Sequence, residues 1–356
     1  MDFETSDDRR MLADTLARFL AEACPPEKRA TLTYAEPFHD PEAWSGLAEL
    51  GVLMAFIPEA EGGLGGGGFD VMTVFEQIGR ALSPEPVLPA LMAARLLLAA
   101  RGDVEGLMSG AVRHAVAIGE PDAPWVLSDI STRAERHDDR WTLTGRKSVV
   151  YGGNDADRLL VVARTGEGLS LFDVSPENAG VIGYGMIDGG GAAEVILDAT
   201  PATLLIENAD DALNDALDHG RLGLCAEAVG AMDHVQALTL DYLKTRQQFG
   251  RPIGKNQALQ HRMVDLMTEI EQARSITILA ASRMAEGDRA RSVAMAKHLV
   301  GRVATLVAEE AIQMHGGIAM TWEHPVSHYA KRLVMIDHQL GDTDFHLSRL
   351  MDDLRA

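Results

Sequence analysis

The chain reads Tyr242-Leu-Lys-Thr-Arg-Gln-Gln-Phe-Gly-Arg-Pro-Ile-Gly-Lys-Asn-Gln257 and, further on, Gln313-Met-His-Gly-Gly-Ile-Ala-Met-Thr-Trp-Glu323. In the first segment, Arg246 follows a stretch of helical periodicity and precedes a Phe-Gly turn, where a guanidinium can fork onto a diphosphate. In the second, Gly316 and Gly317 allow a backbone to approach a ligand closely and leave their amides unobstructed. A helix C-terminus explains either segment alone, but it explains the two together poorly.

Helical periodicity surrounds these segments on both sides. After Asp210 the pattern predicts long helices over about 212–245, 256–286, 289–315 and 326–354. Before about Gly110 it predicts helices near Pro41–Leu50 and Asp70–Leu82. Ser6 is placed as the N-cap of a first helix, whose apolar stripe consists of Met11, Leu12, Leu16, Phe19 and Leu20.

Between these helical regions, the sequence pattern is typical of β-strands. Short β-branched and aromatic runs alternate with Gly, Asp and Asn clusters; the runs include Trp141-Thr142-Leu143, Leu159-Leu160-Val161-Val162 and Val195-Ile196-Leu197. The sequence therefore predicts a helical domain over 1–111, a β domain over 112–205 and a helical bundle over 206–356.

Composition and charge exclude several classes of function. The net charge of −21 opposes binding to nucleic acid or to anionic lipid, because both require surplus Lys and Arg. The apolar stretch Val87–Ala100 is too short to span a bilayer and contains Arg95, and the acidic N-terminus lacks the apolar core of a signal peptide. Two cysteines are too few for a disulfide framework. We therefore expect a cytoplasmic protein.

Two further patterns have simpler interpretations. Gly63, Gly65 and Gly68 match a dinucleotide-binding spacing, but the surroundings are helical and a loop between helices is favoured. His324 and His328 are four residues apart with Pro325 between them and no third ligand in evidence, so we expect no metal site.

The two quoted segments resemble the signatures of the acyl-CoA dehydrogenases, and the resemblance covers nearly the whole chain. Similar runs occur at Trp44, Gly51, Pro58-Glu59, Gly62-Gly63-Leu64-Gly65, Glu76, Glu120-Pro121, Leu143-Thr144-Gly145-Arg146-Lys147 and Asp218-His219-Gly220-Arg221. The resemblance implies an α+β multidomain fold with an N-terminal all-α domain, a middle β-barrel domain and a C-terminal four-helix bundle.

The resemblance also implies a cofactor and partners. In that family FAD accepts a hydride while a carboxylate removes the α-proton of an acyl-CoA thioester. Positions that reach the adenine and diphosphate of a neighbouring subunit's FAD match Arg246, Phe249, Gln257, Gln313, Met314, His315, Gly316 and Gly317. Asp218 and Arg221 match the substrate side. An electron-transfer acceptor protein is a further implied partner.

The base position departs from the family pattern. The usual base is a Glu in a Glu-Gly-Thr turn before the last helix, or in a minority the residue before the position of Arg221, which here is Gly220. The turn reads Gln339-Leu-Gly-Asp-Thr-Asp-Phe-His346, so alignment places either Gly341 or Asp342 at the base position. Asp342 is the candidate base and Glu227 a second one, although a cap or an ion pair is the favoured interpretation of each.

The middle domain departs as well. Asp122-Ala-Pro-Trp-Val-Leu replaces a Gly-Ser-Asp after Pro121, and Val149-Val150-Tyr151 replaces a Trp-Ile-Thr that lies against the flavin. The chain thus resembles the small subunits of heteromeric enzymes, such as that of pimeloyl-CoA dehydrogenase and those of steroid side-chain degradation, in which a larger paralogue supplies the base. Two alternatives stay open: a self-sufficient homo-oligomer with Asp342 as base, and a non-catalytic CoA-binding or assembly protein.

Overall fold

The computed structural model describes residues 6–33 and 35–355 of the chain. The fold divides into two compact units, each assembled from separate stretches of sequence. The barrel unit comprises residues 27–66 and 84–220, and the helical unit comprises the residues up to Pro26, residues 67–83 and the chain from Arg221 onward. In the described part of the chain, no helix is long and apolar enough to cross a membrane.

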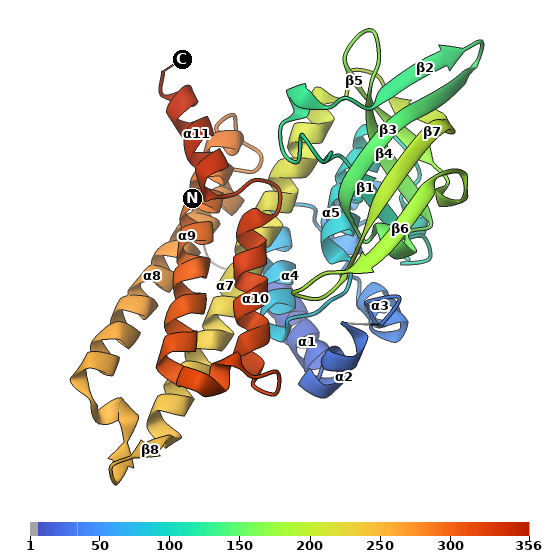
Figure 1. The fold of residues 1–356 in the computed structure, drawn as a ribbon. Helices are drawn as coiled ribbons and strands as arrows, with labels where there is room; N and C mark the ends of the chain where they lie inside the picture. The colour runs from blue at the N-terminus through green and yellow to red at the C-terminus, as the bar shows by residue number, and fades with distance from the viewer. Residues whose placement is uncertain (1–5, 34, 356) are drawn as a thin grey trace. The chain divides into compact units, whose positions relative to one another are not determined.

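Seven strands form the sheet of the barrel unit (Figure 1): β1 (His114–Ala117), β2 (Arg133–His137), β3 (Arg140–Tyr151), β4 (Arg158–Arg164), β5 (Leu169–Val174), β6 (Gly180–Gly185) and β7 (Gly191–Ile206). Pairing runs from β4 through β2, β3, β7 and β5 and returns to β4, which closes a ring. Two pairings of β4, with β1 and with β2, are parallel and the others are antiparallel. The expected β-barrel is therefore confirmed, as a mixed sheet.

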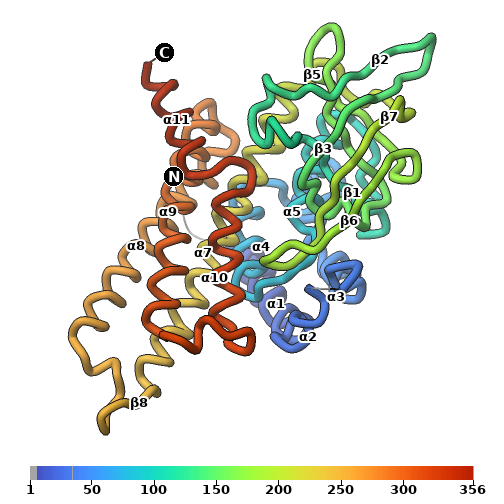
Figure 2. Tube along the Cα trace, viewed as in Figure 1, coloured from blue at the N-terminus to red at the C-terminus, as the bar shows by residue number. Residues whose placement is uncertain are grey.

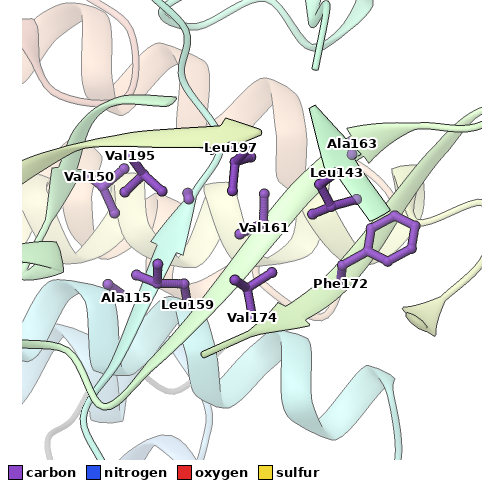
Figure 3. Close-up of a cluster of buried hydrophobic side chains, with 11 residues drawn as sticks. Ala115, Leu143, Val150, Leu159, Val161, Ala163, Phe172, Val174, Val195 and Leu197 are labelled. Carbon is purple, nitrogen blue, oxygen red and sulfur yellow. The ribbon is translucent and has the colours of Figure 1, made fainter. Parts of the chain in front are cut away.

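Alternate residues of the strands fill the interior of this ring (Figure 3). Residues two apart on a strand point to the same face of a sheet, and the buried cluster follows this period at Ala115 and Ala117, at Leu159, Val161 and Ala163, at Phe172 and Val174, and at Val195 and Leu197. Leu143 and Val150 of β3 complete it. Because all are apolar and nearly free of solvent contact, the barrel has a packed core rather than a channel.

The helices of the barrel unit are short: α2 (Pro26–Leu32), α3 (Pro41–Glu49), α5 (Val87–Ala99), α6 (Glu105–Met108) and the first turns of α7. The helix expected near Pro41–Leu50 is confirmed as α3, which begins at the N-cap Asp40 with Pro41 in its first turn. Helix α5 buries ten of its 13 residues and contacts β1. Its apolar surroundings explain why its sequence lacks a polar face.

The helical unit contains α1 (Asp7–Ala23), α4 (Gly68–Ala81), α7 (Asp210–Thr245) from Arg221 onward, α8 (Gln257–Ser282), α9 (Arg289–His315), α10 (Pro325–His338) and α11 (Thr343–Asp353). Helices α8, α9 and α10 lie side by side as a bundle (Figures 1 and 2). The expected cap at Ser6 is confirmed, because its hydroxyl accepts the N–H of Arg9 at 3.4 Å.

One expected helix is wrong in its extent. The stretch 326–354 forms two helices instead of one, because α10 ends at His338 and α11 begins at Thr343. Gly341 has a φ of +103°, which an L side chain rarely adopts, and Asp342 is extended and caps α11. Helical periodicity continues on both sides of this turn, so periodicity alone does not reveal it, although the family resemblance placed a turn here.

Helices α4 and α7 cross in the helical unit with their backbones in direct contact. A Cβ at Gly79 of α4 would lie 1.9 Å from the carbonyl oxygen of Glu227, and a Cβ at Gly230 of α7 would lie 1.9 Å from that of Glu76. The contact is therefore reciprocal, and glycine is required at both positions. It fixes α4 on the C-terminal helices although 140 or more residues separate them in sequence, roughly the length of a typical domain.

Candidate functional site

The first quoted segment forms a tight hairpin at the end of α7. Strands β8 (Gln247–Gln248) and β9 (Arg251–Pro252) pair antiparallel, and Phe249 and Gly250 form the turn with φ values of +51° and +77°. The ring of Phe249 is fully exposed at 101%. Arg246, the first residue after α7, is exposed, and no acidic group within residues 6–33 and 35–355 forms an ion pair with it.

The second quoted segment forms the end of α9 and the 3-10 turn Gly316–Met320. A Cβ placed on Gly316 or Gly317 would meet no atom within 4 Å, so open space lies beside this backbone. The side chain of Gln313 is exposed. The side chains of Met314 and His315 are buried instead, each at 4% exposure.

An aromatic cluster joins the two segments. The ring of Tyr242 on α7 stacks on that of His315 on α9, with centroids 4.5 Å apart, and His324 at the start of α10 lies 4.8 Å from His315. The hairpin and the α9–α10 connection consequently lie at the same end of the helical unit (Figure 1). The structure thus places the exposed Arg246, Phe249, Gln257 and Gln313 at the same end as Gly316 and Gly317. We call these six residues the adenine-diphosphate cluster, after the role that the resemblance predicts for them.

The charge of this end is opposite to that of the chain as a whole. Between Asp241 and Asp265 the sequence contains no acidic residue, but it contains Lys244, Arg246, Arg251, Lys255 and Arg262. Arg262 pairs with Glu310 at 2.6 Å, and the other four face no acid within ion-pair distance in the described chain. A forked guanidinium, unobstructed glycine amides and an exposed aromatic ring together fit the diphosphate and adenine of a dinucleotide.

Of the candidate bases, Asp342 lies beyond the other end of α10, whose 14 residues extend over about 21 Å at 1.5 Å per residue. Glu227 lies beside the middle of that helix. Asp342 accepts the N–H of Phe345 at 2.8 Å as the N-cap of α11. Glu227 forms a bidentate ion pair with Arg332, with N–O distances of 2.6 and 2.8 Å. The cap and the ion pair expected for these carboxylates are both present.

Arg221 of α7 contacts the turn between α10 and α11. Its Nε donates to the carbonyl of Leu340 at 2.9 Å. Arg221 is 2% exposed. Asp218, in the part of α7 that belongs to the barrel unit, is likewise 2% exposed. The substrate-binding role expected of these two residues stays a prediction.

In the barrel unit, two runs that resemble family landmarks meet in one buried ion pair. Glu120 accepts hydrogen bonds from Lys147 Nζ at 2.8 Å and from the hydroxyls and amides of Ser131 and Thr132. Burial alone would raise the pKa of Glu120, but the ammonium of Lys147 and these hydrogen bonds lower it to about 2. Glu120 and Lys147 are therefore structural in this fold.

The run that replaces Trp-Ile-Thr lies on a bulge of β3. The register between β3 and β7 shifts from Lys147 to Val150, and Val149 has a φ of +50° with 40% exposure. A β-branched residue in this region is strained, and the N–H of Val149 donates to Glu194 at 3.4 Å. This part of the barrel therefore presents an aliphatic side chain and a nearby carboxylate.

The two simpler interpretations from the sequence also have structural outcomes. Gly63 lies in the loop before α4, with no strand preceding it among the described residues, and a Cβ there would lie 2.0 Å from the carbonyl of Ile57, which confirms an interhelical loop. His324 Nδ1 accepts the N–H of Val326 as the cap of α10, and His328 bonds the carbonyl of Trp322. Across the described residues, no His, Cys, Asp and Glu group is arranged to hold a metal.

Known families match both ends of the chain. Residues 6–102 match the acyl-CoA dehydrogenase N-terminal domain and residues 211–354 match the acyl-CoA dehydrogenase C-terminal domain. The acyl-CoA dehydrogenase IpdE2 of Mycolicibacterium smegmatis is 30% identical over 97% of this chain and 98% of that protein. The chain belongs to the acyl-CoA dehydrogenase family. As an acyl-CoA dehydrogenase, it is a FAD-dependent oxidoreductase that acts on acyl-CoA.

Solved structures agree with this assignment. The ChsE4-ChsE5 complex from Mycobacterium tuberculosis superposes with a TM-score of 0.91 at 26% identity, covering 100% of this acyl-CoA dehydrogenase and 99% of that chain. A variant of the steroid ACAD Tcur3481-Tcur3483 superposes with a TM-score of 0.90 at 29% identity, covering 98% of each chain. These comparisons confirm the expected family and fold.

Sequence reasoning did not identify Lys297 of α9. This side chain has no solvent exposure, and its Nζ donates to the carbonyls of Ile336, Asp337 and Gly341 at 2.8–2.9 Å. A signal was present, because Lys297 lies on the apolar stripe that contains Val293, Val300 and Ala304. A lysine on a buried face requires several acceptors, and the acceptors here are two carbonyls at the end of α10 and one in the turn that follows it.

Proposed function

We propose that this chain is the small subunit of a heteromeric acyl-CoA dehydrogenase. In this assembly it completes the FAD site of a larger, paralogous subunit and contributes no catalytic base of its own. The observation that carries the proposal is the adenine-diphosphate cluster, which stands exposed at one end of the helical unit with open space beside Gly316 and Gly317.

The hydrogen bonds of the candidate bases also support a catalytic base that comes from the larger subunit. Asp342 is engaged as a helix cap and Glu227 is engaged by Arg332, so neither carboxylate is placed for proton abstraction. A general base must reach the proton that it removes at hydrogen-bond distance. Glycine occupies both other base positions, at 220 and 341.

The structural neighbours point in the same direction. Two that superpose over nearly their whole length are named as assemblies of two different chains, ChsE4-ChsE5 and Tcur3481-Tcur3483. The second is named a steroid ACAD, so a bulky, ring-bearing acyl-CoA belongs among the substrates to be tested.

Each residue of the cluster has a defined task in this assembly. When FAD is bound, the guanidinium of Arg246 would neutralise diphosphate charge, and the amides of Gly316 and Gly317 would donate to phosphate oxygens. Phe249, Gln257 and Gln313 would hold the adenine. Bound FAD supplies the hydride acceptor for α,β-dehydrogenation.

The test is to purify this chain alone, and together with a larger paralogue that has an intact Glu-Gly-Thr turn, and to record flavin absorbance before and after acyl-CoA is added. We expect flavin retention and substrate-dependent bleaching only in the two-chain assembly. Turnover with an artificial electron acceptor should survive Asp342→Asn in this chain and vanish when the paralogue's glutamate becomes glutamine.

Two results would replace this proposal. Ordinary turnover by the chain alone, abolished by Asp342→Asn, would show a self-sufficient dehydrogenase. An assembly that binds acyl-CoA without retaining flavin would show a non-catalytic CoA-binding protein.

A further inference from the structure

Position 341 has no room for a side chain. A Cβ built on Gly341 would lie 2.4 Å from Cδ1 of Phe345 and 2.7 Å from Nε2 of His346, both closer than real Cβ contacts occur. The φ of +103° adds a backbone conformation that L residues rarely adopt. Two separate obstacles, packing and backbone geometry, therefore oppose every residue other than glycine.

The two rings that fill this space are themselves held in place. The N–H of Phe345 is bound by the Asp342 cap, and its ring packs against the imidazole of His346 with centroids 5.1 Å apart and planes at 86°. The guanidinium of Arg349 lies 5.9 Å from the Phe345 centroid. His346 has no solvent exposure, and its Nε2 donates to the carbonyl of Leu340 at 3.3 Å.

Two buried cations fix the backbone of the same turn. Lys297 donates to the carbonyl of Gly341 and to two carbonyls at the end of α10, and Arg221 donates to that of Leu340. A rearrangement that relieved the φ of Gly341 would reorient the carbonyls of Leu340 and Gly341, which accept from Arg221 and Lys297. The cations would then be buried without full hydrogen bonding, which is strongly unfavourable.

We propose that Phe345 and His346 close position 341 to every side chain, and that Lys297 and Arg221 hold the turn in the conformation that makes this closure complete. The chain is thus built to exclude a carboxylate from position 341, and a single Gly341→Glu exchange cannot install one there. The consequence for catalysis rests on the proposed function, because it assumes that a partner supplies the base. The closure itself rests only on the geometry of this turn.

The experiment is a double-mutant cycle in the full chain, with thermal unfolding as the readout. The variants are Gly341→Ala, His346→Ala and the pair, and Gly341→Glu is measured beside them. Gly250→Ala is the control for backbone strain, because Gly250 has a φ of +77° but open space around its Cβ position. Ile270→Ala combined with Gly341→Ala is the control for general destabilisation, because Ile270 is fully buried but is not among the atoms nearest position 341.

We expect Gly341→Ala to lower the Tm more than Gly250→Ala does, and Gly341→Glu to lower it further. In the His346→Ala background, the Gly341→Ala exchange should cause a clearly smaller loss than in the parent, whereas in the Ile270→Ala background the loss should be unchanged. Coupling of Gly341→Ala with His346→Ala but not with Ile270→Ala would distinguish steric closure of position 341 from general destabilisation.

Equal losses for Gly341→Ala and Gly250→Ala, or additivity with His346→Ala, would overturn the closure. A Gly341→Glu chain with the parent's Tm would do the same. A self-sufficient, Asp342-dependent activity would instead refute the proposed function and leave these thermal comparisons valid, so the two failures are distinguishable.

Discussion

The imidazole of His346 stays neutral in the folded chain. Burial, followed by the positive charges of Arg221, Lys297 and Arg349, lowers the pKa of His346 to about 2 from an ordinary value of 6.5. Between these two values the unfolded chain binds a proton that the folded chain does not, so acid favours unfolding. Stability contributed by this group is complete above pH 6.5 and is lost as the pH falls.

We therefore predict that His346→Gln makes the acid side of the stability profile less steep. Below about pH 6 the parent should lose about 1.4 kcal/mol of unfolding free energy per pH unit through this residue, and the variant should not. Urea unfolding at pH 7 and pH 5 provides the measurement. His137→Gln, at an exposed position of β2, is the matched control and should keep the parent's pH dependence.

A second residue-scale prediction concerns Arg246. Arg246→Ala should weaken FAD retention in the two-chain assembly by roughly 1.5–3 kcal/mol, because it removes a charge-assisted contact with the diphosphate. FAD retention in Arg246→Lys should lie between that of the parent and that of Arg246→Ala, since an ammonium keeps the positive charge but cannot form two parallel hydrogen bonds. Arg251→Ala removes the same charge nearby and serves as the control. Unchanged flavin content in Arg246→Ala would refute the assignment.

At this scale the sequence predicted the exposed residues better than the buried ones. Arg246 and Gly316 stand out because an arginine beside a Phe-Gly turn and a pair of adjacent glycines indicate a ligand by their chemistry alone. Lys297 was not identified, because its importance depends on carbonyls that the fold brings to it. Phe345 and His346 belonged to the turn that the resemblance pointed to, but their packing against position 341 cannot be seen from neighbouring residues.

Among the elements, the crossing of α4 and α7 has the tightest geometry. We predict that Gly79→Ala destabilises the helical unit by about 1–3 kcal/mol or more, because its Cβ would overlap the carbonyl of Glu227 and force the helices apart. Gly287→Ala, where a Cβ would meet nothing within 4 Å, should change stability little. Thermal unfolding of both variants compares them directly.

Local patterns predicted most elements but not their ends or partners. Helix α3 and the strands β3, β4 and β7 follow from capping residues and apolar runs that lie within the element itself. Periodicity alone missed the break at Gly341, because one glycine in a periodic stretch is also compatible with a continuous helix. The turn at this position was expected only from the family resemblance. Closure of the barrel depends on the pairing of β4 with β5 and of β5 with β7, and it was expected from the family resemblance rather than from alternation.

For the molecule as a whole, the division into two units predicts which helices and strands lose hydrogen-exchange protection when a core residue is truncated. Leu20 of α1 has no solvent exposure and belongs to the helical unit, where α1 contacts α4. Leu20→Ala should cost about 2–5 kcal/mol. Hydrogen exchange should accelerate in α1 and α4 while β4 and β7 of the barrel unit keep their protection. Equal acceleration in both units would contradict their independence.

The reciprocal glycine contact between α4 and α7 also bears on how the chain is made. Synthesis proceeds from the N-terminus, so α1 and α4 leave the ribosome well before the residues beyond Arg221 on which α4 packs. At a translation rate of roughly 5–20 residues per second, the face of α4 that packs on α7 is without its partner for many seconds. The barrel unit, whose strands all precede residue 221, can fold during that interval. Nascent chains halted before α7 should therefore recruit chaperones through their first helices.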